Sequence, residues 1–274
     1  MRLHLVARLT GLSPRRRAFF AGVALIVVAL AVTAGVRLAL AGGGQTRSTA
    51  ASVRSDVLLV PGYGGSTGAL SQLAARIRRT GQRVTVVPLP GGGTGDLRAQ
   101  AQVLNRYVNQ ALAAGSGPVT VIGYSAGGVV TWLWDVDYHA TSQVRRVITL
   151  GSPLHGASLA ALGTAFDPSE CPVACQQLAP GSTLLTALQR ASAPRPPWLS
   201  LWTTGDQIVR PPDSARLRGA INVPLQSVCP GINVGHGQLP TSALVTGIVL
   251  QALGAAPLAG PDPSQCQSLQ HLGR

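Results

Sequence analysis

Short apolar runs alternate with amphipathic stretches from Val57 onward, and this alternation limits the fold more than any other feature. The apolar runs are DVLLVPG (56–62), RVTVVPL (83–89), PVTVIGYS (118–125), RVITLGSP (146–153), WLSLWTTGD (198–206) and a less regular sixth at 221–228. The first five are short, rich in residues that favour strands, and end in Gly, Pro or polar turn residues, as strands do. Segments 67–79, 96–114, 126–138 and 241–253 have apolar residues at helical spacing. Because strands that are apolar throughout need cover on both faces, the pattern predicts an α/β fold: a mostly parallel sheet with helices on both sides.

The first 44 residues have a different character. A basic cluster, Arg15 to Arg17, precedes an apolar run over 18–36 that is long enough to cross a bilayer. We interpret 1–44 as a cytoplasmic arm, a membrane-spanning or signal helix and a glycine linker, and 45–274 as an exported domain. An uncleaved anchor and a signal peptide cut after Ala39-Leu40-Ala41 both fit the sequence. The domain is therefore expected outside the cell, either attached to the membrane or secreted.

The positive charge does not indicate a nucleic-acid partner. Eight of the 22 basic residues precede Asp56, the first acidic residue, so only +5 of the formal +13 belongs to the rest of the chain. All the basic residues are arginine, and no stripe of aromatic residues accompanies them. We therefore expect no nucleic-acid binding.

The four cysteines all lie in the part expected to be exported. An even number in an oxidising compartment favours disulfides. Three pairings are possible; nearness in sequence favours Cys171 with Cys175, which leaves Cys229 with Cys266 to pin the Pro-rich tail 254–274. A metal site is the alternative, but a single C-x-x-x-C without a second ligand pair is poor zinc spacing. No metal is expected.

The stretch Gly123-Tyr124-Ser125-Ala126-Gly127 matches G-x-S-x-G, between a predicted strand and a predicted helix. Such a turn is so tight that side chains at Gly123 and Gly127 would collide with the neighbouring strand and helix. It lifts the hydroxyl of Ser125 toward the carboxyl edge of the sheet, where ligands bind in open α/β folds.

A serine hydroxyl needs a base to take its proton and an acid to orient that base, in the chain order Ser, Asp or Glu, His. Asp206 follows a predicted strand, and His236 lies in a glycine-flanked loop before the last predicted helix. The other acids considered are Asp135, Asp137, Asp167 and Asp213, and the other histidines are His4, His139, His155 and His271. His155 is the strongest rival, but it precedes Asp206, so we place it on the wall or rim of the site.

The glycine-rich loop VPGYGG after the first exported strand can bring backbone N–H groups close to a substrate. We expect the N–H groups of Tyr63, which follows Gly62, and of Ala126 to stabilise an oxyanion. The loop PLPGGGTGD (88–96) has no GK[ST] and no Rossmann spacing, so no nucleotide site is expected.

At these residues the chain resembles the α/β-hydrolase superfamily, and within it the secreted bacterial lipases and esterases related to triacylglycerol lipases. The resemblance covers roughly 56–253 and depends on VPGYGG, GYSAGG, TLGSPLHG, TTGDQIV and VGHGQLP, in that order. It implies an α/β-hydrolase fold, a triad of Ser125, Asp206 and His236, and oxyanion donors at Tyr63 and Ala126. Many relatives have His-Gly in the oxyanion loop, where this chain has Pro61-Gly62.

The expected activity is hydrolysis of carboxylic esters or lipids through an acyl-serine intermediate, by a monomer without a cofactor. A thioesterase or acyltransferase with the same triad is an alternative, as is a non-catalytic, membrane-tethered binding module. The long excursion 154–197, which contains Cys171 and Cys175, is expected to form a cap over an acyl pocket.

Overall fold

Six parallel strands in the order β2-β1-β3-β4-β5-β6 form the central sheet of the described residues in this computed structural model. The structure describes residues 55–65, 67–160 and 171–274, all within one compact unit, Val53–Arg274. The prediction of a parallel sheet with helices on both faces is confirmed.

The strands are β1 (Ser55–Val60), β2 (Val84–Val86), β3 (Gly117–Tyr124), β4 (Val144–Leu150), β5 (Trp198–Trp202) and β6 (Ile221–Pro224). The α-helices are α2 (Gly68–Arg78), α3 (Leu97–Ala113), α4 (Ala126–Tyr138), α6 (Val173–Gln177), α7 (Thr183–Arg190), α8 (Leu225–Val228), α9 (Ala243–Leu253) and α10 (Cys266–Leu272). Short 3-10 turns are η1 (Pro90–Gly93), η2 (Ala140–Ser142), η3 (Pro212–Ala215), η4 (His236–Gln238) and η5 (Pro263–Gln265).

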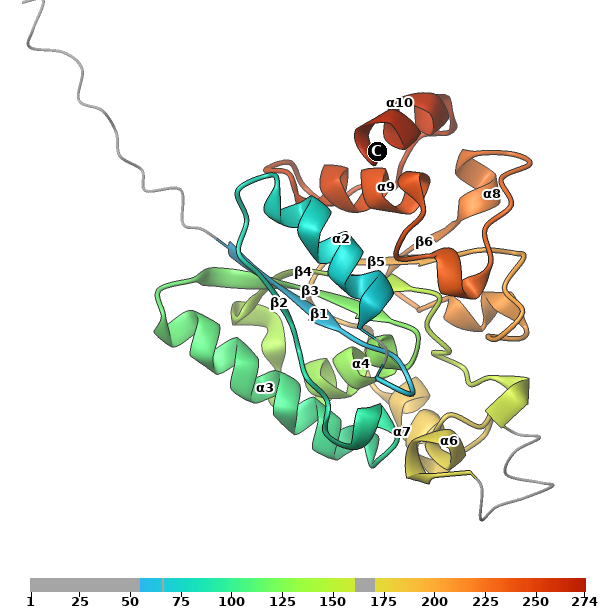
Figure 1. Cartoon of the computed structure of the whole chain (residues 1–274). Coiled ribbons are helices and arrows are strands. Elements are labelled where there is room, and N and C mark those ends of the chain that lie inside the picture. Colours follow the sequence, from blue (N-terminus) through green and yellow to red (C-terminus); the bar gives the residue numbers. More distant parts are fainter. Residues whose placement is uncertain (1–54, 66, 161–170) are drawn as a thin grey trace, which may run out of the picture. The chain divides into compact units, whose positions relative to one another are not determined.

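The sheet separates two hydrophobic cores. Helices α2 and α9 lie over one face and α3 and α4 over the other (Figure 1). Successive residues of a strand point to opposite faces, and β1 shows this directly: Val57 and Leu59 belong to the core under α2 and α9, whereas Leu58 and Val60 belong to the core under α3 and α4. All four side chains are at most 2% exposed, so burial on both faces explains the unbroken apolar character of the strand.

The strand order creates a switch point between β1 and β3. The chain goes from β1 outward to β2 and then returns to the other side of β1 with β3. At such a point the loops that follow the two strands diverge and leave a crevice at the carboxyl edge of the sheet. The loop after β1 begins at Pro61 and the loop after β3 holds Ser125, so the topology brings these two segments together.

The sixth predicted strand is only half a strand. Residues Ile221–Pro224 pair with β5, and Leu225–Val228 form α8 instead of continuing the strand. Pro224 has no N–H with which to extend a ladder, which gives the strand a physical reason to end there.

The tail after α9 is structured. It forms η5 and α10, and α10 packs so closely on α9 that a Cβ atom on Gly247 would overlap the carbonyl oxygen of Leu269. The disulfide Cys229–Cys266 ties this tail to the end of α8, and Cys171 is bonded to Cys175. Both expected pairings are therefore present.

In the described part of the chain, none of the helices has the length and apolar character required to cross a bilayer. The apolar run 18–36, expected to be an anchor or signal helix, lies outside the described residues.

Candidate active site

Ser125 occupies a strained turn between β3 and α4. Its backbone has φ 53° and ψ −127°, a region that residues with a Cβ seldom adopt and that costs of order 1–3 kcal/mol. The Ser125 N–H donates to the carbonyl oxygen of Leu150, at the end of the neighbouring strand β4, over 2.9 Å. The strained backbone and this bond together hold the serine at the carboxyl edge of the sheet.

The glycines on either side of Ser125 are required by close contacts. A Cβ atom on Gly123 would lie 2.6 Å from the Cα of Gly128, in α4. A Cβ atom on Gly127 would overlap the carbonyl oxygen of Val60, the last residue of β1. The crowding expected from the motif is confirmed: one glycine makes room for the helix and the other for the neighbouring strand.

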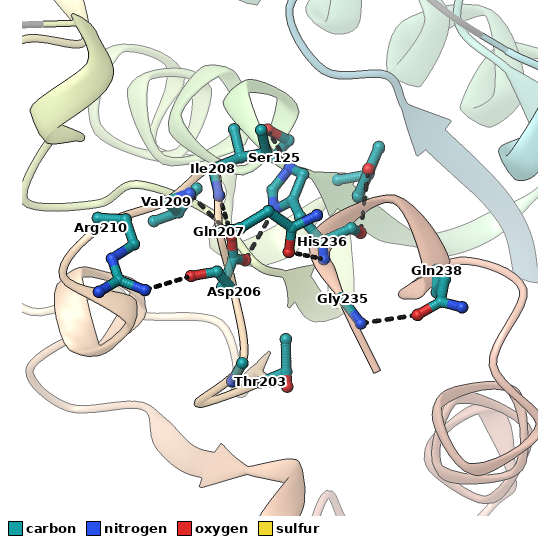
Figure 2. Close-up of polar contacts among 12 residues, drawn as sticks. Ser125, Thr203, Asp206, Gln207, Ile208, Val209, Arg210, Gly235, His236 and Gln238 are labelled. Atoms are coloured by element: carbon teal, nitrogen blue, oxygen red, sulfur yellow. Dashed lines mark hydrogen bonds and ion pairs between the residues drawn. The ribbon is translucent and has the colours of Figure 1, made fainter. Parts of the chain in front are cut away.

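Asp206 and His236 meet Ser125 at this edge, as Figure 2 shows. Nε2 of His236 lies 3.0 Å from Oγ of Ser125, and Nδ1 of His236 lies 2.7 Å from Oδ2 of Asp206. An ionised carboxylate can only accept hydrogen bonds, so Nδ1 holds the proton and Nε2 is left as the acceptor for the serine hydroxyl. The side chains of His236 and Asp206 are 7% and 1% exposed, which shields their contact from water.

The second oxygen of Asp206 is also bonded. Oδ1 accepts the backbone N–H groups of Ile208 at 2.9 Å and Val209 at 2.8 Å (Figure 2). These bonds to the charged form compensate in part for the burial of the carboxylate and fix its orientation toward the imidazole.

The loop after β1 passes directly beside the serine. A Cβ atom on Gly62 would lie 2.8 Å from the Cβ and 3.4 Å from the Oγ of Ser125. Tyr63 follows Gly62, and Ala126 is the first residue of α4, where the N–H has no acceptor within the helix. The two expected oxyanion donors thus lie on segments that flank Ser125, and Tyr63 and Ser125 line one pocket.

That pocket has a volume of about 160 Å³ and is mostly apolar. It is lined by Tyr63, Ser125, Pro153, Ala157, Leu159, Ala160, Cys175, Leu178, Ile208 and Val209. Five of these residues, Ala157, Leu159, Ala160, Cys175 and Leu178, come from the excursion 154–197. A larger hollow of about 460 Å³ lies between Asp96 and Ala187, but Ser125 does not line it. The pocket at Ser125 therefore has the composition to hold an apolar group next to the serine hydroxyl.

The other candidate residues lie elsewhere. The exposed His155 contacts the carbonyl oxygen of Ser214 through Nδ1 at 3.1 Å and lines two hollows in which Ser125 does not take part, so it is not on the wall of the pocket at Ser125.

The acids that were weighed against Asp206 are also accounted for. Asp137 forms an ion pair with Arg98 on the surface, 2.5 Å between Nη1 and Oδ2. Asp135 is buried in α4, where burial raises its pKa to about 6 against the opposing charges of Arg195 and His139. Asp213 is exposed in η3, and Asp167 lies outside the described residues.

Three residues of the site had not been singled out from the sequence. Gly151, with φ +56°, leaves room for the acid–histidine pair: a Cβ atom there would lie 3.3 Å from both Oδ2 of Asp206 and Nδ1 of His236. Tyr124 and Gln207 bond to the backbone of His236. Gly151 has a signal in the sequence, because a glycine directly follows a predicted strand in TLGSP. Tyr124 and Gln207 have no such signal, because a side-chain bond to a distant backbone group leaves no local pattern.

Comparison with known proteins supports the fold. Residues 57–171 match the family model described as alpha/beta hydrolase fold. The chain has the α/β-hydrolase fold. The matched model and the six-stranded parallel sheet agree with the α/β-hydrolase fold that the motifs predict.

Solved lipase structures align with most of the chain. Lipase B of Aspergillus fumigatus aligns with a TM-score of 0.68 at 22% identity, over 81% of this chain and 57% of that one. The mature form of a Bacillus licheniformis lipase aligns with a TM-score of 0.55 at 19% identity, over 62% of this chain and 82% of that one. This chain thus spans little more than half the length of the Aspergillus protein. No curated protein matches it in sequence.

Proposed function

We propose that this α/β-hydrolase cleaves carboxylic esters through an acyl-serine intermediate. The observation that carries the proposal is the relay from Ser125 through His236 to Asp206, with distances of 3.0 and 2.7 Å, at the edge of an apolar pocket. Two lipases share the fold, which supports the same reaction class by analogy.

In the first half of the reaction, Oγ of Ser125 attacks the carbonyl carbon of the ester while Nε2 of His236 takes the hydroxyl proton. The carbonyl oxygen becomes an oxyanion, which the N–H groups of Tyr63 and Ala126 stabilise. The bond between that carbon and the alcohol oxygen then breaks, and His236 returns the proton to the leaving alcohol. The acyl group stays on Ser125.

The second half consumes one water molecule. His236 takes a proton from the water as its oxygen attacks the acyl carbon, and the proton then goes to Oγ of Ser125 as the carboxylic acid leaves. Asp206 holds the imidazole in one orientation and stabilises the imidazolium that forms in both halves. The strained backbone of Ser125 keeps the hydroxyl in place throughout the cycle.

The pocket supports a short or medium acyl group as the substrate. Its volume of about 160 Å³ is close to the about 150 Å³ of an engineered apolar cavity that binds benzene. An acyl chain of about six carbons therefore fits within it, and a longer chain would extend over the exposed side chains at its rim, Tyr63, Leu159 and Ile208. In the proposed arrangement the described residues of the excursion 154–197 cap this pocket.

We also propose that the domain works outside the cytoplasm. The two disulfides, Cys171–Cys175 and Cys229–Cys266, support an oxidising location, because cytosolic thiols are kept reduced. The basic cluster and apolar run before residue 45 would export the domain and either anchor it or be cleaved.

Labelling with a fluorophosphonate probe tests the catalytic proposal. The full chain, Ser125→Ala, His236→Ala and the control His155→Ala are treated with the probe, and the labelled peptide is identified by mass. The proposal requires labelling at Ser125 in the parent and in His155→Ala, none in Ser125→Ala, and strongly slowed labelling in His236→Ala. A folded parent that takes up no probe would contradict it and favour the binding module.

Product analysis separates the related activities. The parent is given esters of graded chain length, a thioester, and an ester together with a competing alcohol. Release of free acid from the oxygen esters supports the hydrolase, whereas transfer of the acyl group to the added alcohol supports an acyltransferase and preference for the thioester supports a thioesterase.

A further inference from the structure

His236 lies in a loop and yet has to keep two short contacts at once. The loop, 229–235, connects α8 to η4, and His236 is the first residue of η4. Its ring must remain 3.0 Å from Ser125 and 2.7 Å from Asp206. Loops move more than the elements they connect, and a misplacement of about 1 Å at a catalytic group can cost about 100-fold in rate. The backbone of His236 therefore needs a restraint from outside its own loop.

Two side chains supply that restraint, one for each backbone polar group of His236. The hydroxyl of Tyr124 donates to the carbonyl oxygen of His236 at 3.2 Å, and Oε1 of Gln207 accepts the N–H of His236 at 3.2 Å. Tyr124 directly precedes Ser125, and Gln207 directly follows Asp206. Ser125 and Asp206 bond to the imidazole ring of His236. Their sequence neighbours Tyr124 and Gln207 thus bond to the backbone of the same histidine, and Figure 2 shows the contact from Gln207.

Both contacts depend on further features of the site. Gly235 makes room for Gln207, because a Cβ atom on Gly235 would lie 3.0 Å from Oε1 of that side chain. The φ of Gly235 is −86°, so glycine is needed there for the approach of Gln207 and not for the backbone conformation. The ring of Tyr124 lies beside the imidazole of His236, with centroids 5.3 Å apart.

The hydroxyl of Tyr124 keeps its proton in neutral solution. Burial, with a smaller contribution from the negative charge of Asp206, raises the pKa of Tyr124 to about 12. Because a carbonyl oxygen can only accept, the protonated hydroxyl is the form that bonds to His236.

We propose that Tyr124 and Gln207 are positioning residues that hold the His236 backbone in register with Ser125 and Asp206. The catalytic part of this inference rests on the proposed function, whereas its structural part concerns only the contact between His236 and Asp206. Removing either side chain would let the imidazole depart from the relay geometry while leaving the pocket, and hence substrate binding, in place.

The test compares Tyr124→Phe and Gln207→Leu with the control Tyr107→Phe, which removes a hydroxyl from a half-buried tyrosine of α3. In full chain labelled with ¹⁵N-histidine, the Nδ1–H proton shared with Asp206 is followed by NMR and its exchange with water is measured. We expect each variant to speed this exchange about tenfold, and to lower kcat about tenfold, the effect of losing one hydrogen bond worth ~1.4 kcal/mol. KM should stay within about twofold of the parent value.

The two readouts separate the inference from the function it rests on. The positioning role would be overturned if proton exchange and kcat both stay within about twofold of the Tyr107→Phe values. This holds even if Ser125 is labelled by the probe. If Ser125 proves unreactive, faster exchange in Tyr124→Phe and Gln207→Leu still supports the restraint on His236, and unchanged exchange still removes it. Phe and Leu are close in size to the side chains that they replace, and Gln207 is exposed, so we expect both variants to fold. Circular dichroism checks this.

Discussion

Gly127, in the first turn of α4, lies directly against Val60 at the end of β1. A Cβ atom on Gly127 would overlap the carbonyl oxygen of Val60 and would lie 2.5 Å from that of Pro61. The contact joins the serine turn to the loop that contains Tyr63. The absence of a side chain at residue 127 therefore allows the start of this loop to lie close to the serine turn.

Substitution Gly127→Ala should lower the free energy of unfolding by at least about 2 kcal/mol, because backbone atoms must move to admit the methyl group. It should also impair probe labelling of Ser125. Urea unfolding measures the first effect. Gly68→Ala, at the first residue of α2, is the matched control: apart from its chain neighbours and the backbone of its own helix, no atom of the described residues lies within 4 Å of a Cβ atom there, so the methyl group should be tolerated. Equal stabilities for the two variants would refute the crowding argument.

Substitution Asp206→Asn should reduce kcat about 10³–10⁴-fold, with little change in KM. The asparagine amide can turn its NH₂ toward His236, and the imidazole would then hold its proton on Nε2, where it cannot accept from Ser125. Steady-state kinetics with a short ester measures the loss. Asp137→Asn removes a surface carboxylate that pairs with Arg98 and should retain activity; a comparable loss there would argue against a specific role for Asp206.

The two disulfides should differ in their effects. In the loop-closure model, the bond Cys229–Cys266, with a sequence separation of 37, stabilises the fold by about 3–4 kcal/mol. The bond Cys171–Cys175, with a separation of 4, contributes about 2 kcal/mol. Double alanine variants of each pair, compared by urea unfolding, test this order.

The same variants test the proposed cap. Cys175 lines the pocket at Ser125, whereas Cys229 and Cys266 do not. Loss of Cys171–Cys175 should therefore change the preference among acyl chains more than loss of Cys229–Cys266 does. An unchanged chain-length profile in the first variant would count against a role of this disulfide in the cap.

Asp135 should make the domain less stable as the pH rises from about 4 to about 6. Burial raises its folded-state pKa to about 6, above the unfolded value of about 3.9. In this interval the folded state binds more protons than the unfolded state, so the free energy of unfolding falls as pH increases. The asparagine of Asp135→Asn does not ionise in this interval. The free energy of unfolding of this variant, relative to that of the parent, should therefore rise by of order 1 kcal/mol between pH 4 and pH 7. Urea unfolding across this range gives the difference; parallel curves would refute the assignment.

Ala157→Leu should shift the acyl preference toward shorter chains. Ala157 is 7% exposed and lines the pocket of about 160 Å³, and three added carbon atoms would occupy a large part of it. Acetate esters should be hydrolysed at close to the parent rate, whereas hexanoate esters should lose at least about tenfold in kcat/KM, as expected when a chain cannot enter its pocket. A chain-length profile like that of the parent would show that the acyl group binds elsewhere.

Much of the fold follows from local patterns. The strand runs, the helix spacing and the G-x-S-x-G turn each reflect requirements that act over a few residues: burial of both faces, one apolar face on a helix, and a turn too crowded for side chains. These requirements can be recognised in the sequence because each of them involves residues that are close together in the chain. The choice of Asp206 and His236 as partners came from chain order after strand ends, and the structure brings both to Ser125.

Other features depended on how distant segments pack. Whether His155 faces the pocket is decided by its bond to Ser214, 59 residues away. The packing of α10 on α9 likewise follows from neighbours that no local pattern specifies.

The sequence by itself determined the parallel α/β architecture, the strained serine turn and the order of the three candidate catalytic residues, because these follow from chain periodicity and from steric limits within one turn. Only the tertiary structure decided the shape of the pocket and the support of His236. The bonds from Tyr124 and Gln207 join residues 112 and 29 positions apart in the chain, and such contacts exist only once the sheet has brought the ends of its strands to one edge.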